Sequence, residues 1–240
     1  MTRIYKFAVL IPAYNEADRI VDTIAGIREH CSAEIVVISD GSSDNTVEKV
    51  REAGAVVIAL PFNIGYGAAL QTGYQYALRK GYAYAVQMDA DGQHDPAFIP
   101  VLIRKVLEGM ADVAIGSRFL GEGVYPLSLT RKTGVLFFRS LASFLTRQTV
   151  TDPTSGFQAL NRKAMELYAS EAYPVDFPDA DVLIMLHRQG LRFAEVPVKM
   201  NPNTKKKTMH SGLVPVYYLF KMLLSIVVTL LRKSEIRRES

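Results

Sequence analysis

The chain has 240 residues, of which 49% are hydrophobic and 22% charged, and its formal net charge at pH 7 is +4. This length is enough to bury one sizeable core, and no low-complexity linker divides the chain, so we expect one globular domain. Cys31 is the only cysteine, which excludes an intrachain disulfide and favours a reducing compartment. The apolar stretch before Pro12 is too short for a signal peptide, so we expect the body to remain in the cytoplasm.

The positive charge is concentrated near the C-terminus. From Asn203 onward, eight Lys and Arg residues stand against Glu235 and Glu239. These cations flank the apolar run 213–231, a combination that anionic membrane surfaces favour and that nucleic-acid-binding arms lack. We therefore expect a membrane surface, and no nucleic acid, as a partner.

Short β-branched runs alternate with segments of helix length through the first half of the chain. The runs are 6–12, 34–39, 55–60, 84–88 and 112–117. This alternation predicts an α/β fold with a mostly parallel, Rossmann-like central sheet that carries helices on both faces. Ligands of such sheets bind at the carboxyl ends of the strands.

Polar residues follow these runs at the points where ligands would bind. Asn15 and Glu16 follow the first run, Asp40 follows the second, and Asp89 and Asp91 follow the fourth. A purely structural sheet more often ends in Gly, Asn or Ser turn residues. The carboxylates at the strand ends therefore predict one shared site.

The second half of the chain is less regular. It contains an amphipathic segment at 129–147, a loop at 151–157, a predicted helix at 179–189 and a predicted strand at 192–200. From residue 213 to Leu231 the pattern is helical and strongly apolar.

Pro215 and Lys221 interrupt this last segment. A spanning helix needs about 20 apolar residues and a Lys in hydrocarbon is costly, so we expect a C-terminal amphipathic or apolar helix that lies at the membrane interface or packs on protein. We accordingly divide the chain into a main domain, 1–212, and a membrane-associating helix with a basic tail, 213–240.

The pair Asp89 and Asp91 has a specific chemical use. Two hard oxygen donors after a buried strand can share one Mg²⁺ or Mn²⁺, which then binds the oxygens of a diphosphate. Phosphatases that use the first Asp as a nucleophile also carry Asp-x-Asp. In those enzymes, however, the pattern follows the first strand, whereas here it follows the fourth.

Other polar residues near the strand ends have simpler explanations. Asn15 or Asp18 could cap a helix, and Asp44 is a plausible N-cap. No capping role accounts for Glu16 or Asp40. A hydrogen-bond acceptor at a strand end can instead bind a nucleobase N–H or ribose hydroxyls.

Seven motifs occur in the order PAYNE (12–16), SDGSSDNT (39–46), NIGYGAA (63–69), DADGQHDP (89–96), GSRF (116–119), DPTSGF (152–157) and EVPV (195–198). As an ordered set they resemble the family 2 glycosyltransferases of GT-A fold. More narrowly, they resemble the polyprenyl-phosphate sugar transferases, such as dolichol-phosphate mannosyltransferase and bacterial relatives that charge undecaprenyl phosphate. The C-terminal segment resembles that of a bacterial subgroup associated with cell-surface polysaccharides. The resemblance implies a GT-A hexosyltransferase domain over 1–212.

The resemblance assigns the donor side of the site. It implies that the nucleotide sugar, linked to UDP or GDP, is bound by Pro12, Ala13, Tyr14, Glu16, Asp40, Gly65, Asp89, Ala90 and Asp91. It implies a metal ion, Mg²⁺ or Mn²⁺, at Asp89, Asp91 and Gln93. Gly65 and Gly67 indicate close approach of the backbone rather than a dinucleotide fingerprint. His94 is expected to be a structural loop residue.

On the acceptor side, the resemblance implies that Arg118, Arg131 and Ser155 bind the phosphate of the lipid. Guanidinium groups suit phosphate because they donate two parallel hydrogen bonds. Lys132 and Arg139 lie near the same amphipathic segment beside apolar side chains, and they could equally form a solvated basic face over the core.

For the reaction, the resemblance implies one in-line displacement at the anomeric carbon, with inversion. A phosphate monoester is already anionic near pH 7, and it needs orientation and charge neutralisation more than deprotonation. Asp152 is the candidate base or acceptor-orienting residue, or else a turn residue before a proline. The predicted catalytic set is Asp91, Arg118, Arg131 and Asp152.

One loop departs from the family pattern. After the EVP strand the family commonly has an Arg-x-x-Gly-x-Ser-like loop, whereas this chain has Asn203 where the Arg is expected. Lys205 to Lys207 could supply the missing positive charge to the diphosphate or to lipid headgroups.

Three functions remain open. The first is a metal-dependent transferase that moves a sugar to polyprenyl phosphate for cell-surface polysaccharide or glycan assembly, anchored peripherally at the cytoplasmic face of the cell membrane. The second keeps the fold and the donor but uses a saccharide hydroxyl as acceptor, which requires a true base. The third is a non-catalytic module that binds nucleotide or lipid. UDP and GDP donors both fit the motifs, and so does a homo-oligomer.

Overall fold

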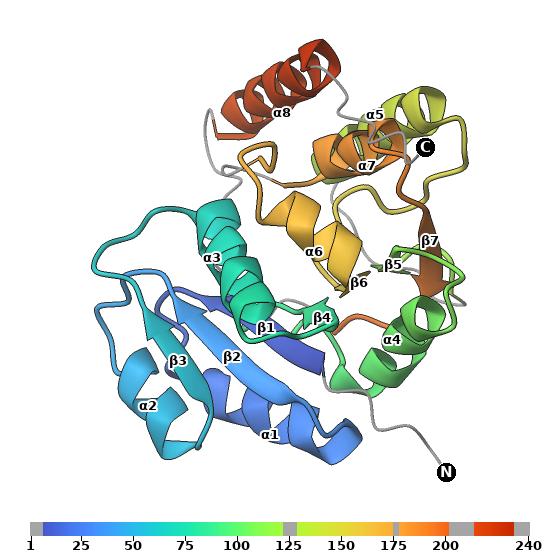
Figure 1. Cartoon of the computed structure of the whole chain (residues 1–240). Helices are drawn as coiled ribbons and strands as arrows, with labels where there is room; N and C mark the ends of the chain where they lie inside the picture. Colours follow the sequence, from blue (N-terminus) through green and yellow to red (C-terminus); the bar gives the residue numbers. More distant parts are fainter. Residues whose placement is uncertain (1–6, 122–128, 175–177, 202–213, 233–240) are drawn as a thin grey trace.

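A computed structural model describes residues 7–121, 129–174, 178–201 and 214–232 of the chain. These residues contain one seven-stranded sheet with the strand order β3-β2-β1-β4-β6-β5-β7 (Figure 1). The strands are β1 (Phe7–Ala13), β2 (Glu34–Ser39), β3 (Val56–Ala59), β4 (Tyr84–Gln87), β5 (Val113–Ser117), β6 (Gln158–Asn161) and β7 (Phe193–Pro197). The helices are α1 (Ile20–His30), α2 (Thr46–Glu52), α3 (Tyr66–Arg79), the 3-10 turn η1 (Pro96–Phe98), α4 (Ile99–Leu107), α5 (Leu129–Thr146), α6 (Arg162–Tyr168), α7 (Ala180–Arg188) and α8 (Val214–Leu231).

All of the described strands run in the same direction except β6. This strand lies between β4 and β5 and is antiparallel to both, whereas the other neighbours pair in parallel. The predicted α/β fold with a mostly parallel sheet is therefore confirmed. Strand β6 and the helix α6 after it were not predicted from the sequence. The four-residue strand Gln-Ala-Leu-Asn has neither a β-branched residue nor an alternating pattern.

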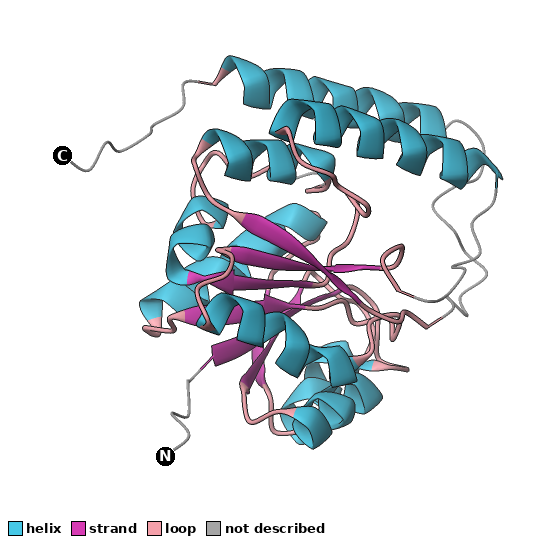
Figure 2. Cartoon of the chain, turned by 90° about the vertical axis from the view of Figure 1, so that its right-hand side faces the viewer, coloured by secondary structure: helices cyan, strands magenta, loops and turns pink. Residues whose placement is uncertain are grey.

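Side chains of the strands alternate between two hydrophobic clusters. In β1, Ala8 and Leu10 belong to one cluster, and Val9 and Ile11 belong to the other. Helices α3, α6 and α7 contribute to the first cluster and α1, α2 and α4 to the second, so helices enclose the sheet on both sides (Figure 2). Because both faces are buried, β1 is apolar and buried along its whole length.

The C-terminal helix α8 packs against α7, and from Leu219 onward it exposes large apolar side chains. Its buried stripe includes Met222, Ile226 and the polar Thr229. An ordinary surface helix has the reverse arrangement, with its polar residues outward. Within the described ranges, no helix combines the length and the apolarity that crossing a bilayer requires. The large apolar side chains that α8 exposes are Leu219, Phe220, Leu223, Leu224, Val227, Val228, Leu230 and Leu231.

A buried carboxylate joins α7 to α8. Asp181 is fully buried, and it accepts hydrogen bonds from the backbone N–H groups of Asp179 (3.0 Å) and Val182 (2.9 Å) and from the hydroxyl of Ser225 in α8. Burial raises the pKa of Asp181 from its ordinary value of 3.8 to about 6, because desolvation outweighs these hydrogen bonds. The ionised form of Asp181 therefore costs folding free energy at neutral pH.

We expect Asp181→Asn to stabilise the folded protein at neutral pH. Asn keeps an oxygen for the two backbone donors and turns its amide toward Ser225. Because the folded pKa of Asp181 lies above its unfolded pKa, wild-type stability attributable to this group falls as pH rises from about 4 to about 6. The free energy of unfolding of the variant should thus exceed that of wild type by up to about 3 kcal/mol above this window and by little below it. Urea unfolding at both ends of the window measures the difference, and a variant less stable than wild type at neutral pH contradicts the prediction.

Candidate active site

The topology brings the motif-bearing loops to one edge of the sheet. Strands β1, β2 and β4 are parallel, so their carboxyl ends at Ala13, Ser39 and Gln87 lie at the same edge. Strand β6 is antiparallel to both β4 and β5, so β5 runs in the same direction as β4. Strand β7 is parallel to β5. Strand β6 begins at that edge with Gln158, which pairs with Gln87. The loop 151–157 before β6 therefore meets the loops that follow the other strands.

The loops after β1 and β2 hold each other. Asn15 has a φ of 54°, a left-handed conformation that Asn tolerates, and its side chain accepts the N–H of Ser43 (2.8 Å). Asp44 accepts the N–H groups of Ala17 (3.2 Å) and Thr46 (3.0 Å). Burial raises the pKa of Asp44, but the hydrogen bonds from Thr46 and the backbone outweigh it and lower the pKa below its ordinary value. Asn15 and Asp44 thus fix the loops, while α1 has no side-chain cap.

Asp40, which the sequence predicted to bind the nucleoside, holds the loop that leads into α3. It is 4% exposed, and its carboxylate accepts the backbone N–H groups of Ile64 (2.7 Å) and Gly65 (3.0 Å). The next residue, Gly41, has a φ of 68°, and a Cβ there would lie 2.5 Å from the backbone nitrogen of Asn63. Asp40 therefore fixes the backbone at Gly65, and the contact of either residue with a nucleotide sugar stays a prediction.

The other predicted donor residues lie along the same edge. Pro12 and Ala13 are buried at the end of β1, Tyr14 is 51% exposed directly after them, and Glu16 is half-buried. Ala90 is buried between the two acidic residues of the Asp-x-Asp motif. The structure thus gathers these residues, and their contacts with a nucleotide sugar stay a prediction.

The predicted metal ligands Asp89, Asp91 and Gln93 lie in the loop after β4 and are partly exposed. Asp91 accepts the backbone N–H of Gln93 (3.0 Å) and contacts its side-chain amide. Turning this amide over would present its oxygen in place of its nitrogen. The loop would then offer two carboxylates and an amide oxygen, which are the hard donors that Mg²⁺ and Mn²⁺ take. Among the residues that the structure describes, no three His, Cys, Asp or Glu side chains are grouped so that they could hold a metal ion.

Contacts from two sides fix the backbone of the acidic loop. Arg19 donates from Nη1 to the carbonyl of Asp91 (2.8 Å). His94 is 4% exposed, accepts the N–H of Asp89 at Nδ1 (3.0 Å), and stacks on Phe157 with 4.9 Å between ring centroids. These contacts support the predicted structural role of His94.

A directed chain of hydrogen bonds ends on Asp89. The hydroxyl of the fully buried Tyr74 donates to the side-chain oxygen of Gln87. The amide of Gln87 donates to the hydroxyl oxygen of Tyr66 (3.1 Å), and the Tyr66 hydroxyl donates to Asp89 Oδ1 (2.7 Å). Tyr66 is 37% exposed, but desolvation of its hydroxyl, together with the charge of Asp89, raises the pKa of Tyr66 well above its ordinary value, so the phenol keeps its proton. Tyr66 was not predicted from the sequence as a site residue, because only its place in the motif NIGYGAA pointed to it.

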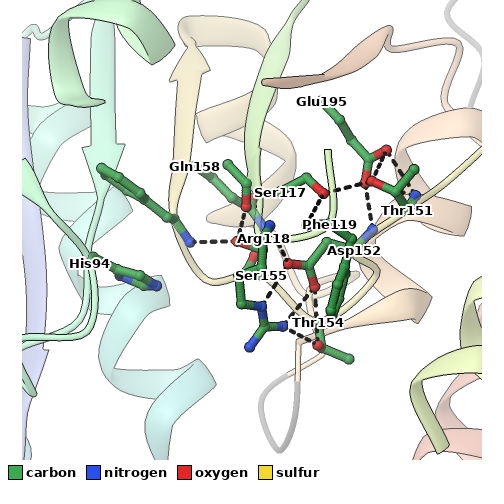
Figure 3. Close-up of polar contacts among 12 residues, drawn as sticks. His94, Ser117, Arg118, Phe119, Thr151, Asp152, Thr154, Ser155, Gln158 and Glu195 are labelled. Carbon is green, nitrogen blue, oxygen red and sulfur yellow. Dashed lines mark hydrogen bonds and ion pairs between the residues drawn. The ribbon is translucent and has the colours of Figure 1, made fainter. Parts of the chain in front are cut away.

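Arg118 and Asp152 form an ion pair at the end of β5 (Figure 3). Nε and Nη2 of Arg118 each donate to one carboxylate oxygen of Asp152 at 2.7 Å, and the backbone N–H of Arg118 donates at 3.1 Å. Nη2 also donates to the hydroxyl of Thr154 (2.7 Å). The side chain of Asp152 is 0% exposed and that of Arg118 is 16% exposed. This geometry favours an orienting role for Asp152, because a base would first have to leave the bidentate pair.

Ser155, predicted at the acceptor phosphate, is engaged inside the protein. It is 5% exposed, donates to the carbonyl of Gly116 (2.6 Å), and accepts the N–H of Phe157 (3.3 Å). These bonds favour a structural role, and a contact between Ser155 and the acceptor stays a prediction.

The structure does not describe the side chains of the other cations predicted for the acceptor and for the loop after β7. Arg131 and Lys132 belong to α5, but their side chains lie outside the described residues, as does the segment from Asn203 to Lys207. Farther along α5, the structure exposes three large apolar side chains, Leu136, Phe137 and Phe144.

Glu195 in β7 is the first residue of the motif EVPV, for which the sequence indicates no role. Its carboxylate accepts the N–H groups of Thr151 (2.8 Å) and Asp152 (2.6 Å) and the hydroxyl of Thr151 (2.8 Å). The hydroxyls of Ser117 and Thr151 are 2.6 Å apart. Figure 3 shows a connected path of contacts from Glu195 through the 151–152 turn to Arg118.

Gly156 lies where the loop 151–157 meets the Asp-x-Asp motif. A Cβ at this position would lie 2.8 Å from the Tyr66 hydroxyl and 3.3 Å from Asp89 Oδ2. We expect Gly156→Ala to displace one of these groups and to weaken Mn²⁺ binding by about 10-fold or more, as when a partner of a metal ligand is lost. Calorimetric titration measures the affinity. Gly134→Ala is the matched control, because a Cβ there meets nothing within 4 Å, and equal affinities of the two variants would contradict the prediction.

Two named glycosyltransferases are similar to this chain in sequence. A UDP-N-acetylglucosamine–dolichyl-phosphate N-acetylglucosaminyltransferase of Methanococcus voltae is 29% identical over 80% of this chain and 84% of its own. A dolichol-phosphate mannosyltransferase of Pyrococcus furiosus is 32% identical over 90% of this chain and 64% of its own.

The fold is shared with a solved enzyme. Glucosyl-3-phosphoglycerate synthase from Mycobacterium tuberculosis, in complex with Mn²⁺, uridine diphosphate and glucosyl-3-phosphoglycerate, matches 93% of this chain and 80% of its own with a TM-score of 0.69 and 21% identity. This likeness agrees with the predicted GT-A type of α/β fold. The model of glycosyl transferase family 2 matches residues 8–168. Since this match spans more than half of the chain, the protein belongs to glycosyltransferase family 2 and is a glycosyltransferase.

Proposed function

We propose that this enzyme moves one sugar from a nucleotide sugar, linked to UDP or GDP, to a polyprenyl phosphate, with inversion at the anomeric carbon. The names of the Methanococcus and Pyrococcus relatives, which refer to dolichyl and dolichol phosphate, support this acceptor class. The complex of the Mycobacterium enzyme with Mn²⁺ and uridine diphosphate supports a divalent cation and a UDP-linked donor. Because the chain is a glycosyltransferase, the alternative of a non-catalytic module falls away.

One short loop, 151–157, contacts both halves of the proposed site, and this contact is the main support for the proposal. Gly156 packs against the carboxylate of Asp89, and Thr154 accepts a hydrogen bond from Arg118. Two residues of chain span at most about 7 Å. The oxygen donors for a cation and a guanidinium group suited to phosphate therefore lie close together. An acceptor phosphate at Arg118 would approach a donor diphosphate at the Asp-x-Asp motif.

The residues of the chain supply orientation and charge. A bound Mg²⁺ or Mn²⁺ would neutralise the charge of the leaving diphosphate. Asp40 shapes the donor side through Gly65, and Arg118 holds the acceptor phosphate by charge-assisted hydrogen bonds. Because a phosphate monoester is already anionic near neutral pH, the transfer depends on positioning rather than on removal of a proton.

A saccharide hydroxyl as acceptor fits the geometry less well. That reaction needs a base to remove the hydroxyl proton. Asp152 is the candidate from the sequence, and both of its carboxylate oxygens accept hydrogen bonds from Arg118. The phosphate acceptor requires no such base, so we prefer it.

Transfer to polyprenyl phosphate should require a divalent cation and Asp91. Asp91→Asn keeps the size of the side chain and removes its charge, and it should lower kcat by about 100-fold, the scale of a lost electrostatic contact to the transition state. Transfer of labelled sugar from UDP- and GDP-sugars, with Mn²⁺ or with EDTA, measures this, and thermal shifts identify the donor that binds.

Asp95→Asn is the matched control for Asp91→Asn. Asp95 lies in the same loop, but its carboxylate caps η1 by accepting the N–H of Ala97 (2.9 Å). Undiminished transfer in EDTA, or an equal loss in both variants, would rule out the proposed metal role of Asp91.

We further propose that the enzyme binds peripherally to the cytoplasmic face of the cell membrane through the outer surfaces of α5 and α8. Both helices pack on α7, and α8 lies at the top of Figure 1, away from the sheet. The described part of α8 exposes eight large apolar side chains, and that of α5 exposes three. The cluster of Lys and Arg residues after Asn203 suits anionic headgroups, each cation near the surface contributing about 1 kcal/mol.

Replacing apolar side chains on α8 should weaken membrane binding. Phe220 is 61% exposed and Leu224 is 47% exposed. Since burying one such side chain contributes about 1.5–3 kcal/mol, the variant Phe220→Ser with Leu224→Ser should lower the partition coefficient onto anionic vesicles by at least about 100-fold. Nucleotide binding should not change. Vesicle co-sedimentation at low and high salt measures the partition.

Met110→Ser is the control for this pair, because Met110 is 56% exposed but lies outside both helices. Unchanged vesicle binding by the α8 variant would refute the membrane role of this surface. A change in oligomeric state, measured by sedimentation equilibrium without any loss of vesicle binding, would instead assign the surface to a homo-oligomer.

A further inference from the structure

We infer that Glu195 is a positioning residue for the acceptor side of the site. It fixes the turn at Thr151 and Asp152 and thereby the direction in which Arg118 points. The inference deepens the proposed function, because it rests on the role of Arg118 in binding the acceptor phosphate.

The first link runs from the sheet to the turn. Glu195 stands on β7, where it pairs in register with Ile115 of β5. The backbone N–H of Thr151 lies 2.9 and 2.8 Å from its two carboxylate oxygens, the Thr151 hydroxyl lies at 2.8 Å, and the N–H of Asp152 lies at 2.6 Å. A strand holds a side chain more precisely than a loop does. The turn before β6 is therefore attached to the sheet by charge-assisted hydrogen bonds.

The second link runs from the turn to the guanidinium group. The buried carboxylate of Asp152 accepts from Nε, Nη2 and the backbone N–H of Arg118. Three donors from one residue define both the rotamer of Arg118 and the plane of its guanidinium. Glu195 thus orients the backbone of Asp152, and the side chain of Asp152 orients Arg118 (Figure 3).

The charge of Glu195 is matched to this task. A carboxylate is an acceptor at both oxygens, and the turn presents N–H and O–H donors to both of them. A Gln at this position would place its NH₂ group against one of those donors. Glu195→Gln therefore changes the hydrogen bonds of the turn while leaving the size of the side chain nearly unchanged.

Steady-state kinetics separate positioning from general stability. Glu195→Gln should raise the KM for polyprenyl phosphate by about 10-fold or more, the scale of one charge-assisted contact, and leave the KM for the nucleotide sugar within about twofold. Because Glu195 acts through Asp152, the double variant Glu195→Gln with Asp152→Asn should be no worse than Asp152→Asn alone. Glu166→Gln is the control, since Glu166 is 54% exposed and pairs with the exposed Arg162 on the surface of α6.

Effects on acceptor and donor of equal size, or additive effects of the two substitutions, would overturn the inference. A crystal structure of Glu195→Gln tests the positioning without any acceptor: we expect Arg118 to leave its bidentate pair with Asp152, and an unchanged pair would refute the role of Glu195. If wild type transferred no sugar to polyprenyl phosphate, the proposed function would fail while this structural test still decided the inference.

Discussion

The antiparallel direction of β6 is the constraint on which the site depends. In a wholly parallel sheet, a loop that precedes a strand lies at the opposite edge from the loops that follow strands. Because β6 runs against β4 and β5, the loop 151–157 enters at the edge that carries the Asp-x-Asp motif. Gly156 can therefore pack on Asp89, and Asp152 can pair with Arg118. One reversed strand joins the proposed cation-binding half and the proposed phosphate-binding half into a single candidate site.

Polar partners whose hydrogen bonds have a defined direction hold the side chains of this candidate site. Tyr74 and Gln87 direct the hydroxyl of Tyr66 to Asp89, and Glu195 holds the turn that carries Asp152. Such networks are costly when one member lacks a partner and rigid when every member is satisfied. Dipoles and charges fixed before the substrates arrive need no reorganisation during the reaction, which is the condition for strong electrostatic catalysis.

The sequence predicted the mostly parallel sheet and the gathering of the candidate residues at one edge because both follow from local patterns. Apolar runs marked the strands β1 to β5, and the parallel topology required polar residues after β1, β2 and β4 to share an edge. The roles of single residues depend on contacts between distant parts of the chain, which periodicity does not encode. Asp40 bonds to the backbone 24 and 25 residues later, and Thr151 bonds to a carboxylate 44 residues later. Strand β6 escaped prediction for the opposite reason, since four residues without a pattern give no local signal.

The outward apolar surface of α8 also affects how the protein unfolds. The heat capacity of unfolding and the denaturant m-value both grow with the apolar surface that is newly exposed to water. Eight large apolar side chains of α8 are already 36–79% exposed in the folded chain and add less to either quantity than buried side chains would. In plain buffer, the chain should therefore unfold with a smaller heat-capacity change and a shallower denaturant dependence than its length implies. Covering this surface with lipid would restore the missing contribution, so the shape of the stability curve itself becomes a property of the environment of α8.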